Sequence, residues 1–330
     1  MKKALLQEKL KNSVKCKNCA HFCVLPEGKT GICQVRRNIN GEIFVQNYQK
    51  LVALQIDPIE KKPLYHFQPG TDTLSIAAAG CSFSCKNCQN WHLSQKNPQQ
   101  LKVKEMSPEN IVRIAKDKKL SSISYTYGEP IIFLEYALDI MKLAKEQSLK
   151  NVWVSNGYFS KQSLHKVAPL LDVINIDLKS FSEDFYKRIC GGRLQPVLDS
   201  IKELHGKVWL EITTLIIPGY NDSENELTDI ADFIASVDKD IPWHISVFSG
   251  RLSKEMKDVP DTPKETIEKA YDIGKKAGLE YIYPGNIVSD KSNTYCPNCK
   301  SKIIERENFK VVKKSDGQCQ SCGQKIKIIN

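Results

Sequence analysis

The sequence predicts an α/β protein whose largest part is a partial (β/α)6-type, TIM-like barrel, between a small N-terminal cysteine-rich segment and a C-terminal zinc-ribbon-like module. Between residues 73 and 284, short apolar runs alternate with longer helical patterns, as in a parallel sheet with crossover helices. With 330 residues and 41% hydrophobic content, the chain can bury one barrel-sized core and carry small modules. Eleven of the 12 cysteines fall into three tight groups. We therefore expect domains at residues 1–72, 73–293 and 294–330.

Seven short apolar runs are the predicted strands. Turn residues or a helical pattern follow each of them. The runs are 73–79, 122–125, 151–155, 173–178, 208–215, 244–248 and 280–283. In a barrel of this kind the functional groups lie at the C-terminal ends of the strands.

Three helices have readable start signals in the sequence. Ser107 precedes a proline, and the segments 223–226 and 262–265 have the Ser/Thr-x-x-Glu spacing of a capping box. We therefore expect helices to begin directly after Ser107, Ser223 and Thr262.

The composition excludes a membrane-spanning or secreted protein. No stretch approaches 18 consecutive apolar residues, and the first ten residues carry charges where a signal peptide needs an apolar core. We therefore expect a cytoplasmic protein. In that reducing compartment, grouped cysteines indicate metal ligands rather than disulfides.

The net charge of +10 is concentrated at the two ends of the chain. Residues 1–18 contain six lysines and one glutamate, and residues 295–330 contain eight lysines or arginines and three acids. Basic ends suggest a nucleic-acid partner, because lysines that neutralise phosphates release counterions. Solvated surface charge is the simpler interpretation, since four thiolates around one Zn²⁺ carry a net charge of −2 that part of the lysine excess can balance.

Three cysteines after the first predicted strand form the most specific motif of the chain. Cys81, Cys85 and Cys88 have the spacing Cys-x3-Cys-x2-Cys and no fourth cysteine nearby. Three thiolates on a 4Fe-4S cube leave one iron open to another ligand. Buried thiols, or a zinc site with a distant fourth ligand, are the alternatives.

This motif resembles the radical S-adenosylmethionine (SAM) superfamily. The resemblance implies that the open iron of a 4Fe-4S cluster binds the amino and carboxylate groups of SAM. It further implies that one electron, supplied by a flavodoxin or ferredoxin type of donor, cleaves SAM to a 5'-deoxyadenosyl radical. The fold expected from the resemblance is the radical SAM barrel.

Polar residues at three further strand ends are candidates for binding SAM. Gly128-Glu129-Pro130 resembles the superfamily element that hydrogen-bonds the SAM amino group, because an ammonium group needs a carboxylate and other acceptors. Asp177-Leu-Lys179 resembles an element of the glycyl-radical activating enzymes that lies beside SAM; a structural ion pair is the alternative. Ser155 and Asn156 complete the set of predicted SAM contacts.

Nearly the whole chain resembles the AmmeMemoRadiSam-system radical SAM family, which is related to the pyruvate formate-lyase activating enzymes. The resemblance implies Memo-like and AMMECR-like partner proteins but no substrate. The segments that carry it are 31–36, 57–66, 88–95, 124–127, 210–214, 218–222, 242–246 and the C-terminal cysteines. The chain differs from this family at residues 247–250, where Val-Phe-Ser-Gly replaces Arg-Phe-His-Pro, so His244 cannot simply take the role of the missing histidine.

Two alternative functions remain open in the sequence. The first is a glycyl-radical enzyme activase, which Cys-Gln-Asn-Trp at 88–91 supports and Val154 weakens, since the activating enzymes commonly have aspartate there. The second is an RNA-binding or RNA-modifying protein that uses basic residues near the C-terminus. Its substrate would be RNA, whereas an activase acts on a protein. The basic residues concerned are Lys300, Lys302, Arg306, Lys310, Lys313 and Lys314.

The other two cysteine groups are predicted metal sites. Cys16, Cys19, Cys23 and Cys33 lie within 18 residues and can close a zinc site or hold a second iron-sulfur cluster, and the sequence does not choose between them. Cys296, Cys299, Cys319 and Cys322 have the paired Cys-x2-Cys spacing of a zinc ribbon, which predicts Zn²⁺.

Catalytic residues on the substrate side are not identified by any motif. Glu211 lies in an apolar strand whose alternation turns it toward the barrel interior, and Tyr125 and His244 are weaker candidates. His66 and the isolated Cys190 are more typical of packed, unreactive residues.

Overall fold

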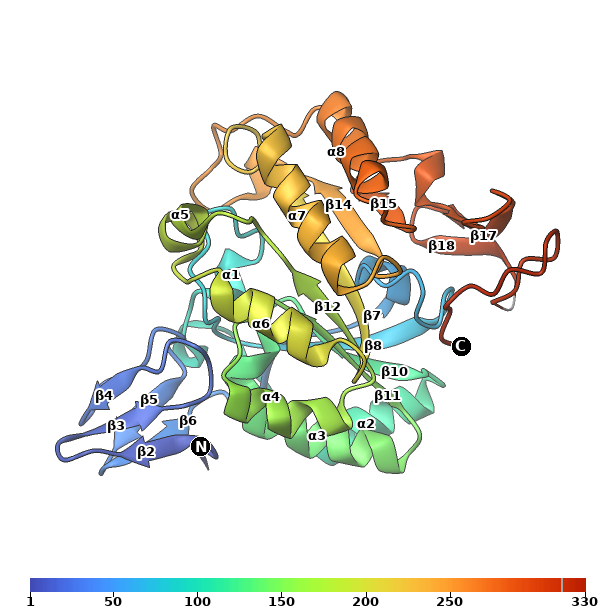
Figure 1. The fold of residues 1–330 in the computed structure, drawn as a ribbon. Helices are drawn as coiled ribbons and strands as arrows, with labels where there is room; N and C mark the ends of the chain where they lie inside the picture. The colour runs from blue at the N-terminus through green and yellow to red at the C-terminus, as the bar shows by residue number, and fades with distance from the viewer. Residues whose placement is uncertain (316) are drawn as a thin grey trace.

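A nine-stranded, mostly parallel sheet forms the centre of the molecule (Figure 1). The computed structural model describes residues 1–315 and 317–330. Seven strands run parallel to one another, and each matches a predicted strand with ends that shift by no more than two residues. They are β8 (Asp72–Ala78), β10 (Ser122–Tyr125), β11 (Lys150–Ser155), β12 (Val173–Asp177), β13 (Trp209–Ile216), β14 (Trp243–Val247) and β15 (Ile282–Gly285).

Two further strands extend the sheet beyond β8, and the first of them, β7, runs antiparallel to its neighbours. β7 (Lys50–Pro58) pairs with β8, and the two-residue β9 (Lys104–Glu105) pairs with β7. The sequence did not predict β7, which lies in the segment expected to form a separate N-terminal unit. Residues 1–72 therefore contribute one strand to the central sheet.

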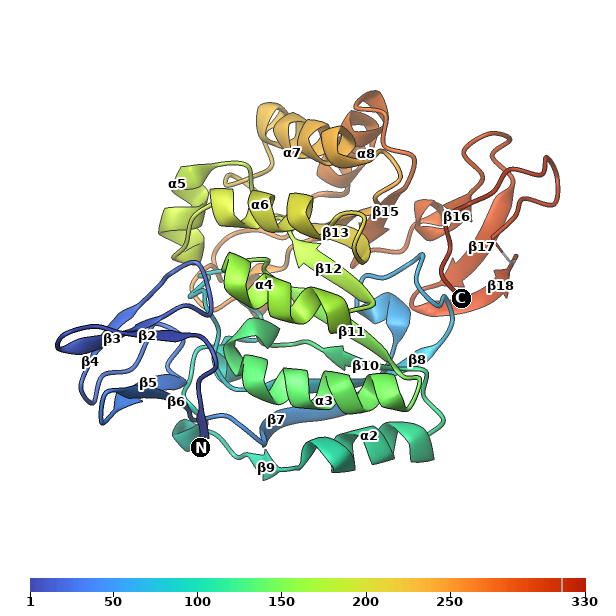
Figure 2. The same ribbon diagram turned by 60° about the horizontal axis from the view of Figure 1, so that its bottom comes forward.

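Six helices cover one face of this sheet (Figure 1 and Figure 2). Alternate strand residues such as Ile76, Trp153 and Ile212 are buried with the apolar sides of the helices in one large core. The helices are α2 (Pro108–Asp117), α3 (Leu134–Glu146), α4 (Lys161–Val167), α6 (Gln195–Leu204), α7 (Glu224–Val237) and α8 (Lys264–Lys276). Two short α-helices, α1 (Trp91–Ser94) and α5 (Glu183–Phe185), lie in loops.

The loops also contain short 3-10 helices and one π-helix. The 3-10 helices are η1 (Ile59–Lys61), η2 (Pro98–Gln100), η3 (Pro130–Phe133), η4 (Ala168–Leu170), η6 (Gly250–Leu252) and η7 (Asp290–Ser292). The π-helix is η5 (Tyr186–Cys190). Such wide turns often occur at functional positions.

The other face of the sheet is filled near the amino ends of the strands by the segment that follows β7. Ile59, Leu64 and Phe67 from this segment pack against Val152 and Val173 of the sheet. Because this end is closed by apolar packing, the loops at the carboxyl ends are the place where a ligand can reach the sheet.

Two of the three predicted helix starts have the expected cap. The Ser107 and Ser223 hydroxyls accept hydrogen bonds from backbone N–H groups of α2 and α7. The third prediction is wrong in detail, because α8 begins at Lys264 without a side-chain cap. The Thr262 hydroxyl instead donates to the Ile216 carbonyl and accepts from the Phe248 N–H, which joins two strand ends.

Small modules lie on opposite sides of the central sheet (Figure 1). The N-terminal module has two three-stranded sheets, formed by β1 (Lys2–Lys3), β6 (Glu42–Val45) and β5 (Arg36–Ile39), and by β2 (Gln7–Lys9), β3 (Ser13–Cys16) and β4 (Val24–Pro26). The C-terminal module has one, formed by β16 (Thr294–Tyr295), β17 (Lys302–Glu307) and β18 (Lys310–Lys314).

Across residues 1–315 and 317–330, none of the helices is both long and apolar enough to cross a membrane.

Candidate active site at the carboxyl ends of the strands

The loop after β8 carries the three cysteines of the predicted cluster site. Cys85 is buried, and Cys81 and Cys88 are half-buried. The loop is fixed by backbone hydrogen bonds from Ser84 to the Cys190 carbonyl (2.9 Å) and from Lys86 to the Ile189 carbonyl (3.0 Å). These bonds connect the loop to the π-helix η5, which is distant in sequence.

Gly80 sets the course of this loop. Its φ is +99°, and a Cβ atom at this position would lie only 2.6 Å from the Cys33 carbonyl oxygen. Glycine is therefore required both by the backbone conformation and by the close approach of the N-terminal module.

The spacing of the three sulfurs is wider than a single metal ion needs. In the described chain, the sulfurs of Cys81, Cys85 and Cys88 do not all lie within 4.8 Å of one another. Two thiolates on one tetrahedral zinc ion lie about 3.8 Å apart, since each Zn–S bond is about 2.3 Å. Thiolates on separate iron atoms of a cluster lie farther apart than thiolates on one ion. The donor set therefore fits a cluster better than one ion.

The protonation of the three thiols differs. Burial raises the pKa of Cys81 and of Cys88. A hydrogen bond with the Cys190 thiol lowers the pKa of Cys85 against the effect of burial, and the Lys179 ammonium acts in the same direction. A positively charged group bound here would stabilise all three thiolates.

Glu129 lies beside this loop, after the end of β10. Its carboxylate is 2% exposed and accepts hydrogen bonds from the Asn156 N–H (2.9 Å), the Ile131 N–H (3.1 Å) and the Ser155 hydroxyl (2.8 Å). Among the described residues, no lysine, arginine or histidine forms an ion pair with it. Burial raises the pKa of Glu129 to about 7 even though these hydrogen bonds oppose the shift. Glu129 is thus a buried acid without a cationic partner.

Asn156 connects the glutamate to the cysteine loop. Its side-chain nitrogen lies 3.0 Å from the Ser82 hydroxyl and 3.7 Å from the Cys81 sulfur, while its backbone N–H donates to Glu129. Gly128 allows the same close packing, since a Cβ there would lie 3.0 Å from the Ala78 carbonyl oxygen. The ends of β8, β10 and β11 therefore meet at one place.

Asp177 and Lys179 add an ion pair at the end of β12. The Lys179 ammonium lies 2.9 Å from the Asp177 carboxylate, and the Lys179 side chain is 19% exposed. Burial alone would lower the pKa of Lys179, but the charges of Asp177 and of the Cys85 thiolate raise it instead. The lysine is thus positively charged and close to the cysteine loop.

Cys190 is the residue of this region that the sequence did not identify. It is fully buried at the end of η5, and its thiol lies near Cys85 and lowers the pKa of Cys85. The sequence interpretation of an isolated, inert cysteine missed this contact. Only the tertiary packing of η5 against the cysteine loop creates it.

Glu211 and His244, two of the candidate catalytic residues, lie at the other end of the sheet. They occur early in β13 and β14, and the Glu211 carboxylate accepts four hydrogen bonds, including one from His244 Nε2 at 2.7 Å. Burial would raise the pKa of Glu211, but the hydrogen bond and charge of His244 lower it instead. This network joins the segment below the sheet to the strands.

Tyr125 and His66 also lie outside the group around Glu129. Tyr125 is on the helix-covered face of β10, and its hydroxyl donates to Asn151 at 3.2 Å. His66 is buried against the Tyr283 hydroxyl at 2.6 Å, and burial lowers its pKa to about 4. Both residues are in packed surroundings.

The four N-terminal cysteines line one cavity. Cys16, Cys19, Cys23 and Cys33 surround an empty volume of about 310 Å³, part of it open to solvent. Burial, followed by the charges of the neighbouring thiols, raises the pKa of Cys19. Burial also raises the pKa of Cys33 to about 11. The chain therefore brings these four predicted ligands together.

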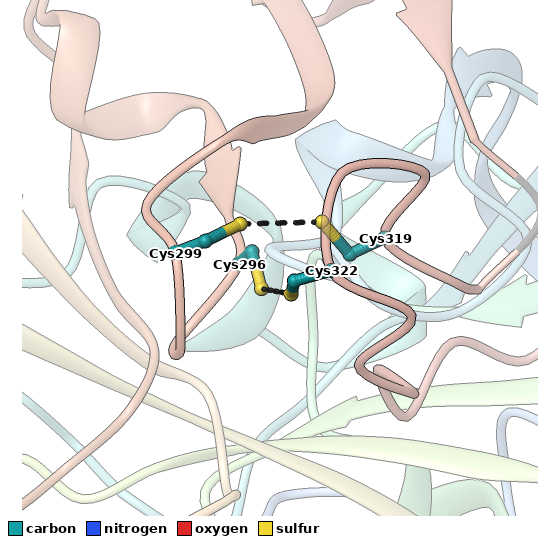
Figure 3. A group of neighbouring side chains, drawn as sticks. All are labelled: Cys296, Cys299, Cys319 and Cys322. Atoms are coloured by element: carbon teal, nitrogen blue, oxygen red, sulfur yellow. Dashed lines mark hydrogen bonds between the residues drawn. The ribbon is translucent and has the colours of Figure 1, made fainter.

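The four C-terminal cysteines are packed more tightly (Figure 3). Their sulfurs all lie within 4.8 Å of one another, with Cys296 and Cys322 separated by 3.6 Å and Cys299 and Cys319 by 3.4 Å. This spacing matches four thiolates around one ion. A cysteine cluster suited to metal binding is therefore present in the C-terminal module.

The basic residues of the C-terminal module are largely occupied within the molecule. Arg306 is buried, with its guanidinium over the Tyr65 ring at 4.2 Å and 3.7 Å from Glu60. Lys302 pairs with Glu305 at 2.8 Å, and Lys314 donates to the Pro69 carbonyl. These contacts do not favour the RNA-binding alternative.

Comparison with known proteins gives one matching family and several relatives. The family model described as "Radical SAM superfamily" matches residues 75–234. An uncharacterised protein of Methanocaldococcus jannaschii, MJ0808, is 42% identical over the whole length of both chains. A second protein of that organism, whose name assigns it to the glycyl-radical enzyme activating enzymes, is 30% identical across 62% of this chain and 78% of its own.

Solved structures show the same fold. The Streptococcus suis protein SuiB, bound to its precursor peptide SuiA, has a TM-score of 0.51 and 15% identity, with 69% of this chain and 51% of that chain covered. At this identity the likeness concerns the fold alone. The family match at residues 75–234 includes the strand ends that carry the three cysteines and Glu129.

Proposed function

The chain belongs to the radical SAM superfamily and is an enzyme, and from that premise we propose that Cys81, Cys85 and Cys88 hold a 4Fe-4S cluster whose open iron binds SAM. When bound, the cluster supplies the electron that cleaves SAM to a 5'-deoxyadenosyl radical, which abstracts hydrogen from a substrate. The wide spacing of the three sulfurs supports a cluster at this site.

The uncompensated charge of Glu129 carries the proposal. Its carboxylate accepts three protein hydrogen bonds and forms no ion pair among the described residues, and burial raises its pKa to about 7. The amino group of SAM, whose nitrogen the open iron would bind, carries N–H donors, and its binding beside the cysteine loop would give this buried acceptor its missing partner. Gly128, Ser155 and Asn156 hold the glutamate in place for this contact.

Lys179 is proposed to bind the other charged end of SAM. Its ammonium is held by Asp177 and faces the cysteine loop, where a carboxylate would find an opposite charge. Amino and carboxylate groups of one ligand would then meet Glu129 and Lys179 on two sides of the cluster site. Tyr125, Glu211 and His244 are not part of the proposed site.

The finer identity proposed for the chain is the AmmeMemoRadiSam-system family, in a cytoplasmic enzyme with a partial barrel and a C-terminal zinc ribbon. Its partners would be a one-electron donor of the flavodoxin or ferredoxin type and Memo-like and AMMECR-like proteins. The motifs at residues 57–66 and 218–222 support this family, and the sulfur spacing of the C-terminal cysteines supports zinc. The proposed domains are residues 1–72, 73–293 and 294–330, with β7 of the first segment paired to β8 in the central sheet.

A glycyl-radical activase is the second candidate function. The relative that is 30% identical and named among such activating enzymes favours it. If the chain is an activase, incubation with SAM, reductant and a glycyl-radical enzyme from the same organism should produce an organic radical on that enzyme, measured by electron paramagnetic resonance. If no radical forms while SAM is cleaved, the substrate belongs to another class.

SAM cleavage tests the proposed function directly. The protein, reconstituted without oxygen and reduced with dithionite, should form 5'-deoxyadenosine from SAM. Cys88→Ala should abolish this product, whereas Lys86→Ala, an exposed residue on the same loop, should retain it. Equal product from both variants would refute the assignment of the three cysteines, and so would an intact cluster that never cleaves SAM.

A further inference from the structure

The N-terminal cysteines differ from the C-terminal group in their sulfur spacing. Within residues 1–315 and 317–330, only the C-terminal cysteines have sulfurs that all lie within 4.8 Å of one another. No three of Cys16, Cys19, Cys23 and Cys33 meet that limit, although all four line one cavity. Four thiolates on one zinc ion would need separations of about 3.8 Å. The N-terminal sulfurs are spread more widely than this.

The cavity has few polar groups that compete with the cysteines. Apart from the cysteines, it is lined by Asn18, His21 and Arg36 together with apolar side chains and a glycine. His21 Nε2 is already engaged with the Ser82 carbonyl at 2.8 Å. Thiolates are therefore the main donors that face the space, and soft thiolate ligands select iron-sulfur clusters as readily as zinc.

Arg36 adds a polar atom without a partner at the edge of this cavity. Its terminal nitrogens form a buried, two-pronged pair with Glu135 at 2.6 and 3.1 Å, but its Nε–H is buried and has no hydrogen-bond partner. A buried N–H donor of this kind is costly unless an acceptor is present. The sulfur atoms of a bound cluster are acceptors that would satisfy it.

We propose that Cys16, Cys19, Cys23 and Cys33 hold a second 4Fe-4S cluster, with one cysteine on each iron. Because no iron is open, this cluster would bind no SAM, so the assignment goes beyond the proposed function. The site adjoins the first one, since the Cys33 carbonyl packs against Gly80, the residue directly before Cys81. His21 bonds to Ser82, directly after it.

Metal analysis of a full-length variant that lacks the first site tests this inference. Cys81→Ala, Cys85→Ala and Cys88→Ala are combined, and the protein is reconstituted anaerobically with iron and sulfide. We expect about four irons and four sulfides per chain, with a reduced-cluster resonance that SAM does not change. One zinc per chain should remain as a check that the C-terminal module is folded. Two zincs and no iron would overturn the proposal.

A reciprocal variant separates this inference from the proposed function. When the four N-terminal cysteines are replaced by serine, the remaining iron should be about four per chain and its resonance should change on addition of SAM. If this variant does not fold, the wild-type iron content decides: about eight irons per chain support the proposal, and about four refute it. If the resonance of this variant does not change on addition of SAM, the assignment of the Cys81 site is contradicted. The inference about the N-terminal cysteines is then unaffected.

Discussion

Two buried glutamates at opposite ends of the sheet have similar numbers of hydrogen bonds and opposite pKa shifts. Glu211, near the amino ends, accepts bonds from two backbone N–H groups, Trp209 and His244, and its pKa is lowered. Glu129, at the carboxyl ends, accepts bonds from two backbone N–H groups and Ser155, and its pKa is raised to about 7.

The difference between them is the cationic partner. His244 Nε2 lies 2.7 Å from the Glu211 carboxylate, and its hydrogen bond and charge lower the pKa of Glu211. Glu129 has hydrogen bonds but no balancing charge among the described residues. Burial therefore raises its pKa, because a desolvated anion is unfavourable without a cation. One glutamate is balanced by a partner within the fold, and the other is the proposed acceptor for a ligand.

The largest effect is expected for Glu211→Gln. The amide cannot accept all four hydrogen bonds, and it would turn its own N–H groups toward buried donors. We expect the free energy of unfolding to fall by about 3 kcal/mol, as when a buried charged pair is broken. Denaturant unfolding measures this. The folded fraction should bind SAM as the wild type does, and a stable variant with weakened SAM binding would contradict the comparison.

Glu129→Gln should have the opposite pattern. The side chain has no cation to lose, but its amide nitrogen would face a buried donor, so the free energy of unfolding should fall by about 1–2 kcal/mol, less than for Glu211→Gln. SAM binding should weaken by about ten- to a hundredfold, because a charge-assisted hydrogen bond is worth about 1.5–3 kcal/mol. Isothermal titration of the reconstituted protein with SAM gives the affinity. Unchanged affinity would show that the amino group binds elsewhere.

The pH dependence of SAM binding tests the same difference between Glu129 and Glu211. With the pKa of Glu129 raised to about 7, the carboxylate forms as the pH rises from 6 to 8. SAM affinity should therefore increase over this range by up to about tenfold, and Glu129→Gln should remove the increase. A flat profile in the wild type would contradict the raised pKa.

In the absence of SAM, the free energy of unfolding should decrease as the pH rises, which is opposite to the change expected for SAM affinity. A carboxyl group with a raised folded pKa contributes its full stability below its unfolded value, and that contribution is lost as the pH rises through about 7. The wild type should lose stability relative to Glu129→Gln between pH 5 and pH 8. Urea unfolding of both proteins, matched in cluster content, measures the difference.

The smallest effect is expected for Tyr283→Phe. Its hydroxyl lies 2.6 Å from His66 Nε2 and 2.9 Å from the Thr294 hydroxyl, in the network below the sheet. We expect a stability loss of about 1 kcal/mol, measured by thermal unfolding, with no change in SAM affinity. A change in affinity would show that the amino end of the sheet communicates with the cluster site.

The strands of the sheet were predictable because their signals are local. Each apolar run is followed by turn residues and a helical pattern, and these fix the element without reference to distant contacts. β7 lacked such a signal, since its place is set by antiparallel pairing with β8 and not by its own pattern. The prediction of a helix cap at Thr262 was wrong for a related reason. Its hydroxyl forms hydrogen bonds with two neighbouring strand ends and not with the helix.

The part of the site that belongs to one sequence motif could be predicted from the sequence. The part that depends on tertiary packing could not. Cys81, Cys85, Cys88 and Glu129 follow strand ends in the sequence, and the structure places them side by side. Cys190 carried no signal, because its contact with Cys85 depends on how η5 packs. Glu211 did offer a signal, which the sequence prediction overlooked. It lies near the start of its strand, whereas ligand sites in such barrels lie at the carboxyl ends of the strands.

The C-terminal module limits association of two copies of the chain through the edge of the central sheet. β15 is the last strand of an open sheet, and an exposed sheet edge invites pairing with a second molecule. Pro284 offers no N–H there, and the Ser292 hydroxyl covers its carbonyl at 3.1 Å. Tyr283 is held by Thr294 of the module. A metal that keeps this module folded would therefore also reduce aggregation through the β15 edge of the sheet.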